Sequence, residues 1–389
     1  MNSNIQFMAL GGGQNVGASC YFLKLDDTYI MLDCGVGYDK NIIFEPCFNW
    51  IIEPPFMQSM HQLQNVFISH AHMDHIGALP QLFRQNNDIS IYMTELTSIF
   101  CKYQLYDRTY INTNNLSSEN ERLGIKNIID KISTVTYNTT LNFKKYKVEF
   151  FNAGHIPGAA MILIIYKRIK ILYTGDFSEF STPLTDGYLL PQNLHPDIVI
   201  MCGLHAKHPC YSRNNNNINN ILNRIEDLIR NNCSVYCKVH QLSKGIEFLK
   251  ILTKFMINKG YSDIPIYIEK NFTDMIHEVE RLNVMLWEIN CHSINNLKFN
   301  KNNHLHIVIG SSNYQYNNEV IVNVDFSLHE DFQGLCKFIK DLNPKVTVVV
   351  HCGKERENEN NNTIEQQVMK NSESRTQFIF ADNNEIYNL

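Results

Sequence analysis

Four side chains of metal-binding type are crowded into the segment FISHAHMDHIGALP, which begins at Phe67. His70, His72, Asp74 and His75 follow an apolar run and occupy four of six consecutive positions. This spacing does not put all four on one face of a helix or strand, whereas a tight loop can direct them toward two points. Imidazole nitrogen and carboxylate oxygen are suitable zinc ligands, and catalytic zinc keeps one position open for water. Because the loop alone has too few ligands for two ions, we expect others from elsewhere in the chain.

Other short apolar runs also end in polar residues that could complete such a site. His155 follows YKVEFFNAG, Asp176 follows IKILYTG, and His351 follows KVTVVV. Each run is rich in β-branched or aromatic residues, which predicts a strand. Ligands at strand ends are held by a rigid sheet while the loops stay exposed. The pattern therefore predicts a site at one edge of a sandwich.

The elements that must position these residues alternate along the chain. IQFMALGGG, ASCYFLKL and YIMLDCG predict three strands between Ile5 and Gly35, separated by turns. Apolar residues at intervals of three and four predict helices over residues 218–232, 243–260 and 332–342. Alternating strands and helices predict an α/β protein built from layers.

Composition limits the class of protein only loosely. The chain has 389 residues, of which 44% are apolar, and a formal net charge of −5. This charge gives no general attraction to nucleic acid, so a polyanionic partner would need a local positive site such as bound metal. Eleven cysteines without CxxC pairs suit a reducing compartment. The chain shows no secretory signal or membrane-length apolar window, so we expect an intracellular protein with no membrane partner, in the nucleus if it is eukaryotic and otherwise in the cytoplasm.

The motifs together resemble a known family. HxHxDH, a distant GH, a distant TGD and a late VHxG resemble the metallo-β-lactamase fold, and specifically the β-CASP nucleases. LGGGQNVGASCYFLKLDDTYIMLDCG is similar to the start of the nuclease subunits of the cleavage and polyadenylation factor and the Integrator complex, and of their prokaryotic relatives. DFSLHEDF and PKVTVVVHCGKE resemble two later family motifs. The resemblance implies an αββα sandwich, over residues 1–202 and 325–389, with a shortened β-CASP α/β domain inserted over residues 203–324.

The resemblance also implies roles for individual residues. The implied ligands of two zinc ions are His70, His72 and His155 for one ion, Asp74, His75 and His351 for the other, and Asp176 between them. Asp33 would orient the ligand loop from just outside, which is how hydrogen bonds fix histidine tautomers. His329 would help to protonate the leaving oxygen, although a histidine near a helix start could instead cap or pack. The predicted catalytic residues are Asp74, Asp176 and His329.

The sequence departs from the family pattern in three places. Cys202 stands where the family has an acid that pairs with the histidine equivalent to His329, and a thiol of ordinary pKa cannot replace that charge. His205 and His208 are nearby candidates for a substitute. Lys244 replaces an arginine and would contact substrate phosphate without a bidentate grip. Between HIVIGSSN and VDFSLHEDF the chain is too short for the expected glycine segment and following strands.

These features predict a dinuclear zinc phosphodiesterase that hydrolyses RNA as an endonuclease, with exonuclease action left open. Single-stranded RNA is the expected substrate, and members of an RNA-processing complex are expected partners. One alternative is a weakly active or inactive scaffold that binds RNA or a partner nuclease, which Cys202 favours. Another is a hydrolase of small esters with the same fold, against which the placement of His329 and His351 counts.

Overall fold

The computed structural model describes most of the chain, in eleven segments. They are residues 4–40, 42–52, 56–111, 117–208, 216–240, 244–282, 291–293, 305–311, 319–353, 363–370 and 376–389, with side chains at 107–111, 117–120, 216, 270 and 271 left aside. The chain divides into two compact units. The first comprises Met1–Phe180, Asp186–Ser212 and His329–Leu389, and the second comprises Ser181–Thr185 and Arg213–Leu328.

The first unit contains two large mixed sheets. One has the order β21-β1-β2-β3-β6-β7-β8 and the other has the order β20-β19-β13-β12-β11-β10-β9. The strands of the first sheet are β1 (Ile5–Gly11), β2 (Cys20–Leu25), β3 (Thr28–Leu32), β6 (Asn65–Phe67), β7 (Ser90–Thr94), β8 (Ile132–Val135) and β21 (Tyr387–Asn388). Those of the second are β9 (Thr140–Asn142), β10 (Tyr146–Asn152), β11 (Ala160–Tyr166), β12 (Ile169–Tyr173), β13 (Ile198–Cys202), β19 (Val346–Val350) and β20 (Gln377–Phe380).

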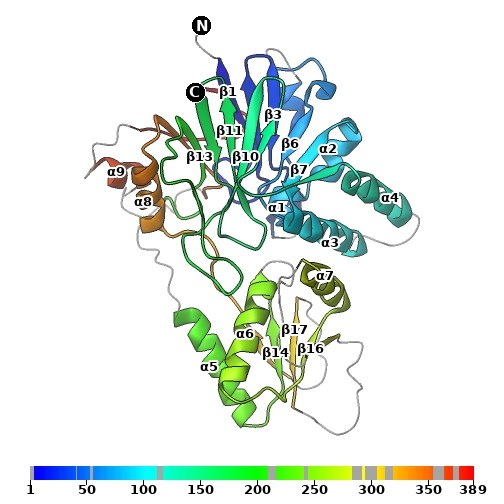
Figure 1. Cartoon of the computed structure of the whole chain (residues 1–389). Coiled ribbons are helices and arrows are strands. Elements are labelled where there is room, and N and C mark those ends of the chain that lie inside the picture. The colour runs from blue at the N-terminus through cyan, green and yellow to red at the C-terminus, as the bar shows by residue number, and fades with distance from the viewer. Residues whose placement is uncertain are drawn as a thin grey trace. The chain divides into compact units, whose positions relative to one another are not determined.

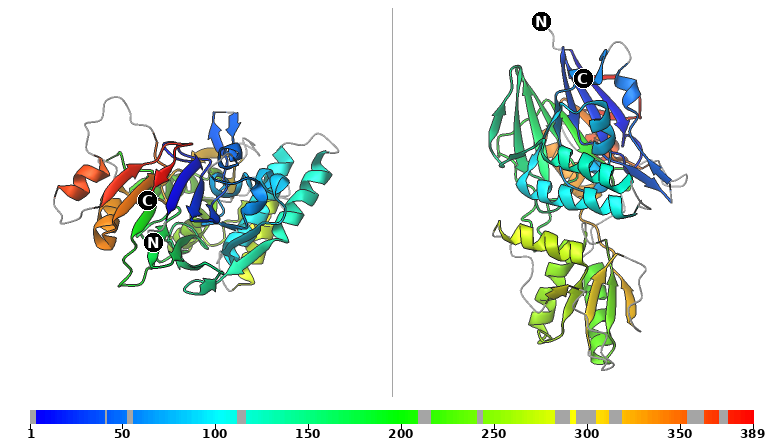
Figure 2. Two further views of the ribbon diagram at one scale, coloured as in Figure 1. Left: turned by 90° about the horizontal axis from the view of Figure 1, so that it is seen from above. Right: turned by 90° about the vertical axis from the view of Figure 1, so that its right-hand side faces the viewer.

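Helices flank this two-sheet core on both sides. In Figures 1 and 2, α2, α3 and α4 lie at one side of the sheets and α8 and α9 at the other. The helices of this unit are α1 (Met73–Ile76), α2 (Leu79–Gln85), α3 (Glu95–Ile111), α4 (Ser117–Ile129), α8 (Phe332–Leu342) and α9 (Ile364–Met369). The 3-10 turns η1 (Phe48–Ile51) and η2 (Met60–Gln62) and the hairpin β4 (Gly37–Asp39) and β5 (Ile42–Phe44) complete it. The predicted αββα layering is thus confirmed.

The core between the two sheets follows from period-two alternation in the strands. On β11, Ala160, Ile162, Ile164 and Tyr166 all belong to the buried cluster shared with residues of β1, β2 and β10. Alternate residues of a strand point to the same face, so one face of β11 meets the opposite sheet. Met161, between them, is also fully buried. Burial on both faces explains why this strand is a continuous apolar run.

Strand direction brings the polar strand ends to one edge. In the second sheet, β12, β13 and β19 are parallel neighbours, and β10 runs antiparallel to β11, which runs antiparallel to β12. Therefore β10, β12, β13 and β19 all run in the same direction. In the first sheet, β3 and β6 are parallel neighbours. The residues that follow these strands accordingly gather at the same ends of the sheets.

The second unit contains a separate five-stranded sheet with the order β16-β15-β17-β14-β18, in which every neighbouring pair is parallel. Its strands are β14 (Val235–Lys238), β15 (Ile266–Ile268), β16 (Cys291–Ser293), β17 (Ile307–Gly310) and β18 (Val320–Asn323). Its helices are α5 (Asn216–Arg230), α6 (Ile246–Asn258) and α7 (Lys270–Glu280). Helices between parallel strands are the usual way to connect them.

Two details of the second unit differ from the sequence prediction. The segment expected to have lost its strands retains β18, because the apolar run Val320–Asn323 pairs with β14 at the edge of the sheet. At the predicted boundaries, residues 203–208 belong to the first unit and residues 325–328 belong to the second. Gly203 N–H donates to the Val350 carbonyl at 2.7 Å and Ile364 N–H donates to the Ala206 carbonyl at 3.1 Å, and these bonds fasten the turn to the first unit.

The HxHxDH turn after β6 is fastened to the turn after β3 by backbone hydrogen bonds. Cys34 N–H donates to the His75 carbonyl at 2.7 Å, and Val36 N–H donates to the Met73 carbonyl at 3.0 Å. Gly35 lies between these bonds, where the two backbones touch. A side chain at Gly35 would begin 1.7 Å from the Asp74 carbonyl oxygen, so only glycine permits this approach.

We therefore expect Gly35→Ala to lower the free energy of unfolding by about 1–3 kcal/mol, because the added carbon forces two backbones apart. Zinc affinity should fall as well. Chemical denaturation and zinc titration would measure the two effects. Gly124→Ala, in α4, is the matched control. Beyond the adjacent backbone of α4, no described residue has an atom within 4 Å of the added carbon, and alanine is favoured over glycine in a helix by roughly 0.5–1 kcal/mol. Equal responses of the two variants would contradict the packing argument.

Candidate metal centre

All of the predicted metal ligands come together at the edge of the first unit. They form two groups that share Asp176 as a neighbour, and within each group the ligand atoms lie within 4.8 Å of one another. The first group comprises His70, His72, His155 and Asp176, and the second comprises Asp74, His75 and His351. These groups divide the residues as the family resemblance implies. His155, Asp176 and His351 are far along the chain from the HxHxDH loop and become its neighbours only through the two sheets.

The first group surrounds one point. His72 Nδ1 lies 3.1 Å from His70 Nε2 and 3.3 Å from His155 Nε2. Asp176 Oδ2 lies 3.6 Å from His70 Nε2 and 3.8 Å from His155 Nε2. Tetrahedral ligands at about 2.0–2.1 Å from zinc are themselves about 3.4 Å apart, so these separations suit a zinc ion.

The second group is more open. Asp74 Oδ2 lies 3.9 Å from His75 Nε2 and 3.8 Å from His351 Nε2. Asp176 Oδ2 is 3.4 Å from His75 Nε2, so the same carboxylate oxygen faces both groups. Asp74 is 27% exposed, whereas the ring of His351 is only 2% exposed. Solvent would therefore reach a cation in this group from the side of Asp74.

Unpaired buried atoms support a cation at this place. His75 Nε2 and Asp176 Oδ1 are buried and have no hydrogen-bond partner among the described residues. A buried polar atom without a partner is unfavourable, and coordination to a cation would satisfy both. Nitrogen and carboxylate oxygen are ligands that zinc accepts, so the residues fit the predicted ion.

Asp33 is the buried anchor of the ligand loop. Its Oδ2 accepts hydrogen bonds from His75 Nδ1 at 2.6 Å, from the Ser69 hydroxyl at 2.6 Å and from the Tyr173 hydroxyl at 2.5 Å. Its Oδ1 accepts the Ser69 N–H at 2.7 Å. A carboxylate only accepts, so His75 carries its proton on Nδ1 and presents Nε2 to Asp176. Asp33 itself has a positive φ of 56°, a strained conformation that these bonds hold in place.

Burial and the neighbouring carboxylates shift the pKa values of the histidines in opposite directions. Burial lowers the pKa of His70 and of His72 well below the ordinary histidine value, which favours neutral, metal-binding imidazoles. Burial acts in the same direction on His75, but the carboxylates of Asp176, Asp33 and Asp74 outweigh it and raise the pKa of His75. Burial disfavours the charged form of Asp176, yet His75 and its other imidazole neighbours hold the pKa of Asp176 well below its usual range. Asp176 is thus an anion ready to bind a cation.

Two serines and a tyrosine that the sequence analysis missed hold the ligands in place. Ser19 Oγ lies 2.9 Å from His351 Nδ1, and Ser69 Oγ lies 3.0 Å from His70 Nδ1. Tyr173, on β12, reaches Asp33 from the opposite sheet. For these three residues the sequence held one signal, which is that Ser69 directly precedes His70. Ser19 and Tyr173 carry no signal because only the fold brings them close.

His329 faces the first ligand group. Its Nδ1 lies 3.6 Å from Asp176 Oδ2, and its ring centre is 4.7 Å from that of His155. It is not the cap of α8, since Asp331 accepts the capping hydrogen bond from Gly334 N–H. Burial lowers the pKa of His329 well below the ordinary histidine value, although Asp176 acts in the opposite direction.

The residue after His329 fixes its position. Glu330 N–H donates to the Phe177 carbonyl at 2.9 Å, next to Asp176. The buried Glu330 carboxylate accepts the N–H of Glu179 at 2.5 Å and that of Asp331 at 3.1 Å. Burial raises the pKa of Glu330. Glu330 therefore ties the start of α8 to the loop that carries Asp176, a role with no sequence signal.

Cys202, at the end of β13, lies beside Asp176 and His329. Burial raises the pKa of the Cys202 thiol well above its ordinary value, and the charge of Asp176 adds to this. Cys202 therefore supplies no negative charge to His329. His205 has its ring centre 6.4 Å from that of His329, and burial lowers the pKa of His205 to about 4. The ring of His208 is a further 6.5 Å from His205, and no observation assigns either histidine the missing acid's role.

Lys244 belongs to the second unit. Its Nζ forms an ion pair with Asp325 Oδ1 at 2.5 Å, and both side chains are substantially exposed. Exposed ion pairs contribute little to the free energy of folding, so this pair would not prevent Lys244 from exchanging Asp325 for a phosphate. Contact between Lys244 and substrate phosphate stays a prediction.

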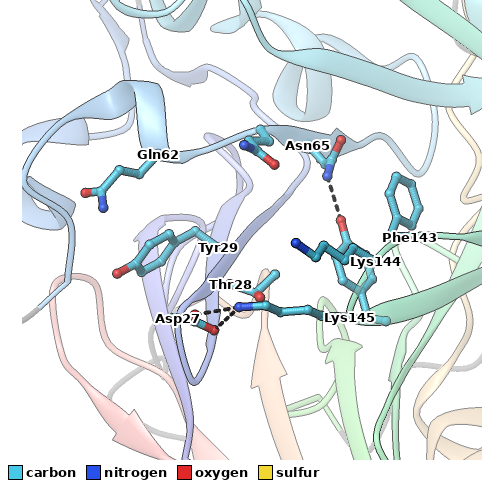
Figure 3. A pocket seen from close by; sticks show the side chains of 10 residues that line it. Asp27, Thr28, Tyr29, Gln62, Asn65, Phe143, Lys144 and Lys145 are labelled. Carbon is cyan, nitrogen blue, oxygen red and sulfur yellow. Dashed lines mark hydrogen bonds and ion pairs between the residues drawn. The ribbon is translucent and has the colours of Figure 1, made fainter.

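A pocket elsewhere in the first unit contains none of the predicted ligands (Figure 3). It has a volume of about 360 Å³ and lies near the starts of β3 and β6, whereas the ligands follow the ends of such strands. Lys145 pairs with Asp27 at 2.5 Å, and Asn65 donates to the Tyr146 hydroxyl at 2.7 Å. Because these groups already satisfy one another, we assign the pocket no ligand.

Comparison with known proteins gives consistent matches. A family model described as a metallo-beta-lactamase superfamily domain matches residues 22–194. The protein named Probable RNase MJ4 of Methanocaldococcus jannaschii is 33% identical over 262 residues, which cover 67% of this chain and 58% of that protein. Endoribonuclease ysh1 of Schizosaccharomyces pombe is 29% identical over 271 residues, which cover 68% of this chain and 34% of that protein. Cleavage and polyadenylation specificity factor 73 of Drosophila melanogaster is 29% identical over 273 residues, 68% of this chain and 38% of that protein.

The chain thus spans between about one third and three fifths of the length of these relatives. A crystal structure of a protein of unknown function from Enterococcus faecalis V583 resembles the whole chain, with a TM-score of 0.64 at 14% sequence identity and complete coverage of both chains. This likeness concerns the fold. Among the described residues, no helix has both the length and the apolar character needed to cross a membrane.

Residues 22–194 match the metallo-beta-lactamase superfamily domain, and the αββα layering of the first unit agrees with that match. Within that superfamily, its resemblance to the β-CASP RNA nucleases is confirmed by the relatives just described.

Asp33→Asn should weaken zinc binding by about 10–100-fold, because an amide cannot accept all of the hydrogen bonds that orient His75 and Ser69. Competition titration against a chromogenic chelator would measure the affinity. Asp27→Asn, which alters the exposed ion pair with Lys145, is the matched control and should bind zinc as the unaltered chain does. Unchanged affinity in Asp33→Asn would refute the orienting role.

Proposed function

We propose that the chain is a dinuclear zinc phosphodiesterase that hydrolyses RNA. The main support is the pair of ligand groups around Asp176, whose ligand atoms lie 3.1–3.9 Å apart, as ligands of bound cations do. The names of the relatives, an RNase and an endoribonuclease, support RNA as the substrate class. Imidazole nitrogen and carboxylate oxygen are ligands that catalytic zinc sites use, so both groups suit zinc.

In this proposal, each ligand group holds one ion and Asp176 lies between the two. When bound, two zinc ions would lower the pKa of a water molecule and neutralise charge on the phosphate oxygens. The protein's own contribution is to fix the ligands: Asp33 orients His75, Ser19 orients His351, and the sheets keep both groups rigid. No nucleophilic side chain is needed.

His329 is the proposed proton donor to the leaving oxygen. It neighbours Asp176 and is fixed through Glu330, which supports a position beside the reacting phosphate. Burial holds its pKa low, so the imidazole is neutral at pH 7 in the free chain. The negative charge of a bound phosphate would raise that pKa, and His329 would then carry the proton that the leaving oxygen takes.

Single-stranded RNA is the proposed substrate, and internal cleavage the proposed action, with exonuclease action as an addition. The name of the endoribonuclease relative supports internal cleavage. Partners from an RNA-processing complex are proposed because one relative is named as a cleavage and polyadenylation specificity factor.

Purified protein should contain close to two zinc ions per chain and should cleave single-stranded RNA. Asp74→Ala and His75→Ala each remove a ligand of the second group, so each should lower the cleavage rate at least about 100-fold. Elemental analysis and cleavage of a labelled RNA would measure these effects. Asp27→Ala, which lies outside the ligand groups, should leave both unchanged. Full zinc content without cleavage of any nucleic acid would reject the proposed function.

A second candidate is a weakly active scaffold that binds RNA or a partner nuclease. The observation that favours it is Cys202, whose buried thiol cannot give His329 the negative neighbour of the family pattern. The intact ligand groups oppose it, since buried polar ligands are costly without a cation.

Cys202→Glu separates the two candidates. If the chain is already a working nuclease, the cleavage rate should change less than about 10-fold, whereas restoring acid catalysis in a weakened one would raise it by about 10²–10⁴. The gain must act through His329, so it should disappear in the double variant with His329→Ala. A large gain that survives in the double variant would mean that the new carboxylate does not act through His329. That result would contradict the proposed role of His329 as proton donor.

A further inference from the structure

The sulfur of Cys202 is held next to the carboxylate of Asp176. Strand β13 pairs in parallel with β12, and Cys202 N–H donates to Thr174 Oγ1 at 3.0 Å, two residues before Asp176. On its other side, Gly203 N–H donates to the Val350 carbonyl at 2.7 Å, directly before His351. These bonds fix the backbone of Cys202 between two ligand-bearing loops. The position of its side chain is therefore set by the sheet.

Cys202 forms a third ligand group with Asp176 and His329. One ligand atom from each of the three residues lies within 4.8 Å of the others. Cys202 is 5% exposed and Asp176 is 1% exposed, so two of the three are removed from solvent. Nothing in the two-ion scheme uses the sulfur.

The carboxylate of Asp176 has capacity for a ligand in this group beyond the imidazoles that it faces. Asp176 Oδ2 faces the imidazoles of His70, His75 and His155. The other oxygen, Oδ1, is buried and has no hydrogen-bond partner among the described residues. A carboxylate has enough lone pairs to bind a further cation through this oxygen. A cation shared by Oδ1 and a sulfur would satisfy it.

We propose that Cys202, Asp176 and His329 form a further cation site, which takes a thiophilic divalent cation such as Zn²⁺ and inhibits RNA cleavage when it is filled. Sulfur ligands select zinc and cobalt over magnesium or calcium. Binding displaces the thiol proton to solvent and forms a metal–sulfur bond. A cation on His329 also occupies the nitrogen that would carry the proton to the leaving oxygen. The binding of the cation is independent of the proposed function, and only the inhibition rests on it.

Cobalt substitution tests the binding directly. Metal-free protein titrated with Co²⁺ should develop a near-ultraviolet sulfur-to-cobalt charge-transfer band after the first two equivalents have bound. Cys202→Ser should abolish this band while the visible bands of the first two equivalents remain. Cys101→Ser is the matched control, because Cys101 is also buried and lies on α3, outside all three ligand groups.

Three outcomes decide the assignment. Loss of the band in Cys202→Ser, with native circular dichroism and an unchanged band in Cys101→Ser, supports the site. Absence of the band in the unaltered chain overturns it. Loss of the band in Cys352→Ser but not in Cys202→Ser also overturns it, because Cys352, directly after His351, is the other buried cysteine near Cys202.

Zinc titration of RNA cleavage tests the inhibition. Cleavage by the unaltered chain should rise with the first two equivalents of Zn²⁺ and fall with excess. Cys202→Ser should need at least about 10-fold more zinc for the same inhibition, since loss of a ligand weakens the site. Equal inhibition of both chains overturns the inhibitory role. If no cleavage occurs at any zinc concentration, the proposed function fails, and the cobalt band still reports on the site.

Discussion

The buried carboxylate of Asp33 is the interaction on which the ligand arrangement depends. It accepts hydrogen bonds from Ser69 and His75, which belong to the turn after β6, and from Tyr173, which belongs to the opposite sheet. One side chain thus joins three segments at the place where ligands must be fixed. Burying an anion is unfavourable, and four hydrogen bonds are the compensation that makes it tolerable. The positive φ of Asp33 shows that the backbone accepts strain to keep the carboxylate there.

Strand direction supplies the second requirement. Because β10, β12, β13 and β19 run in the same direction, the residues that follow them reach one edge even though they are separated by long stretches of chain. His155, Asp176 and His351 reach the loop that carries His70 in this way. A rigid sheet keeps such ligands at fixed separations, which is what a pair of cations needs.

Cys202 reaches the same edge by the same rule, and it changes the chemistry there. The thiol cannot act as the charged neighbour of His329 at neutral pH. The sulfur nevertheless lies among oxygen and nitrogen ligands. A single substitution at a strand end can therefore exchange an acid–base partner for a cation ligand, because the backbone position is imposed by the sheet while the side chain decides the chemistry.

The sequence by itself determined the ligand types and most of the elements. HxHxDH and three polar strand ends were enough to predict which side chains meet at this edge. Short runs of β-branched or aromatic residues predicted strands such as β12, and apolar residues at intervals of three and four predicted helices such as α8. These signals are local, so they survive in the linear chain. Only the tertiary structure decided that Tyr173, Ser19 and Glu330 would hold Asp33, His351 and the start of α8, because hydrogen bonds between distant segments leave no periodic trace in a sequence. The same holds for Gly35 and for the unpaired oxygen of Asp176, since a close backbone approach and a missing partner exist only once two sheets have been packed together.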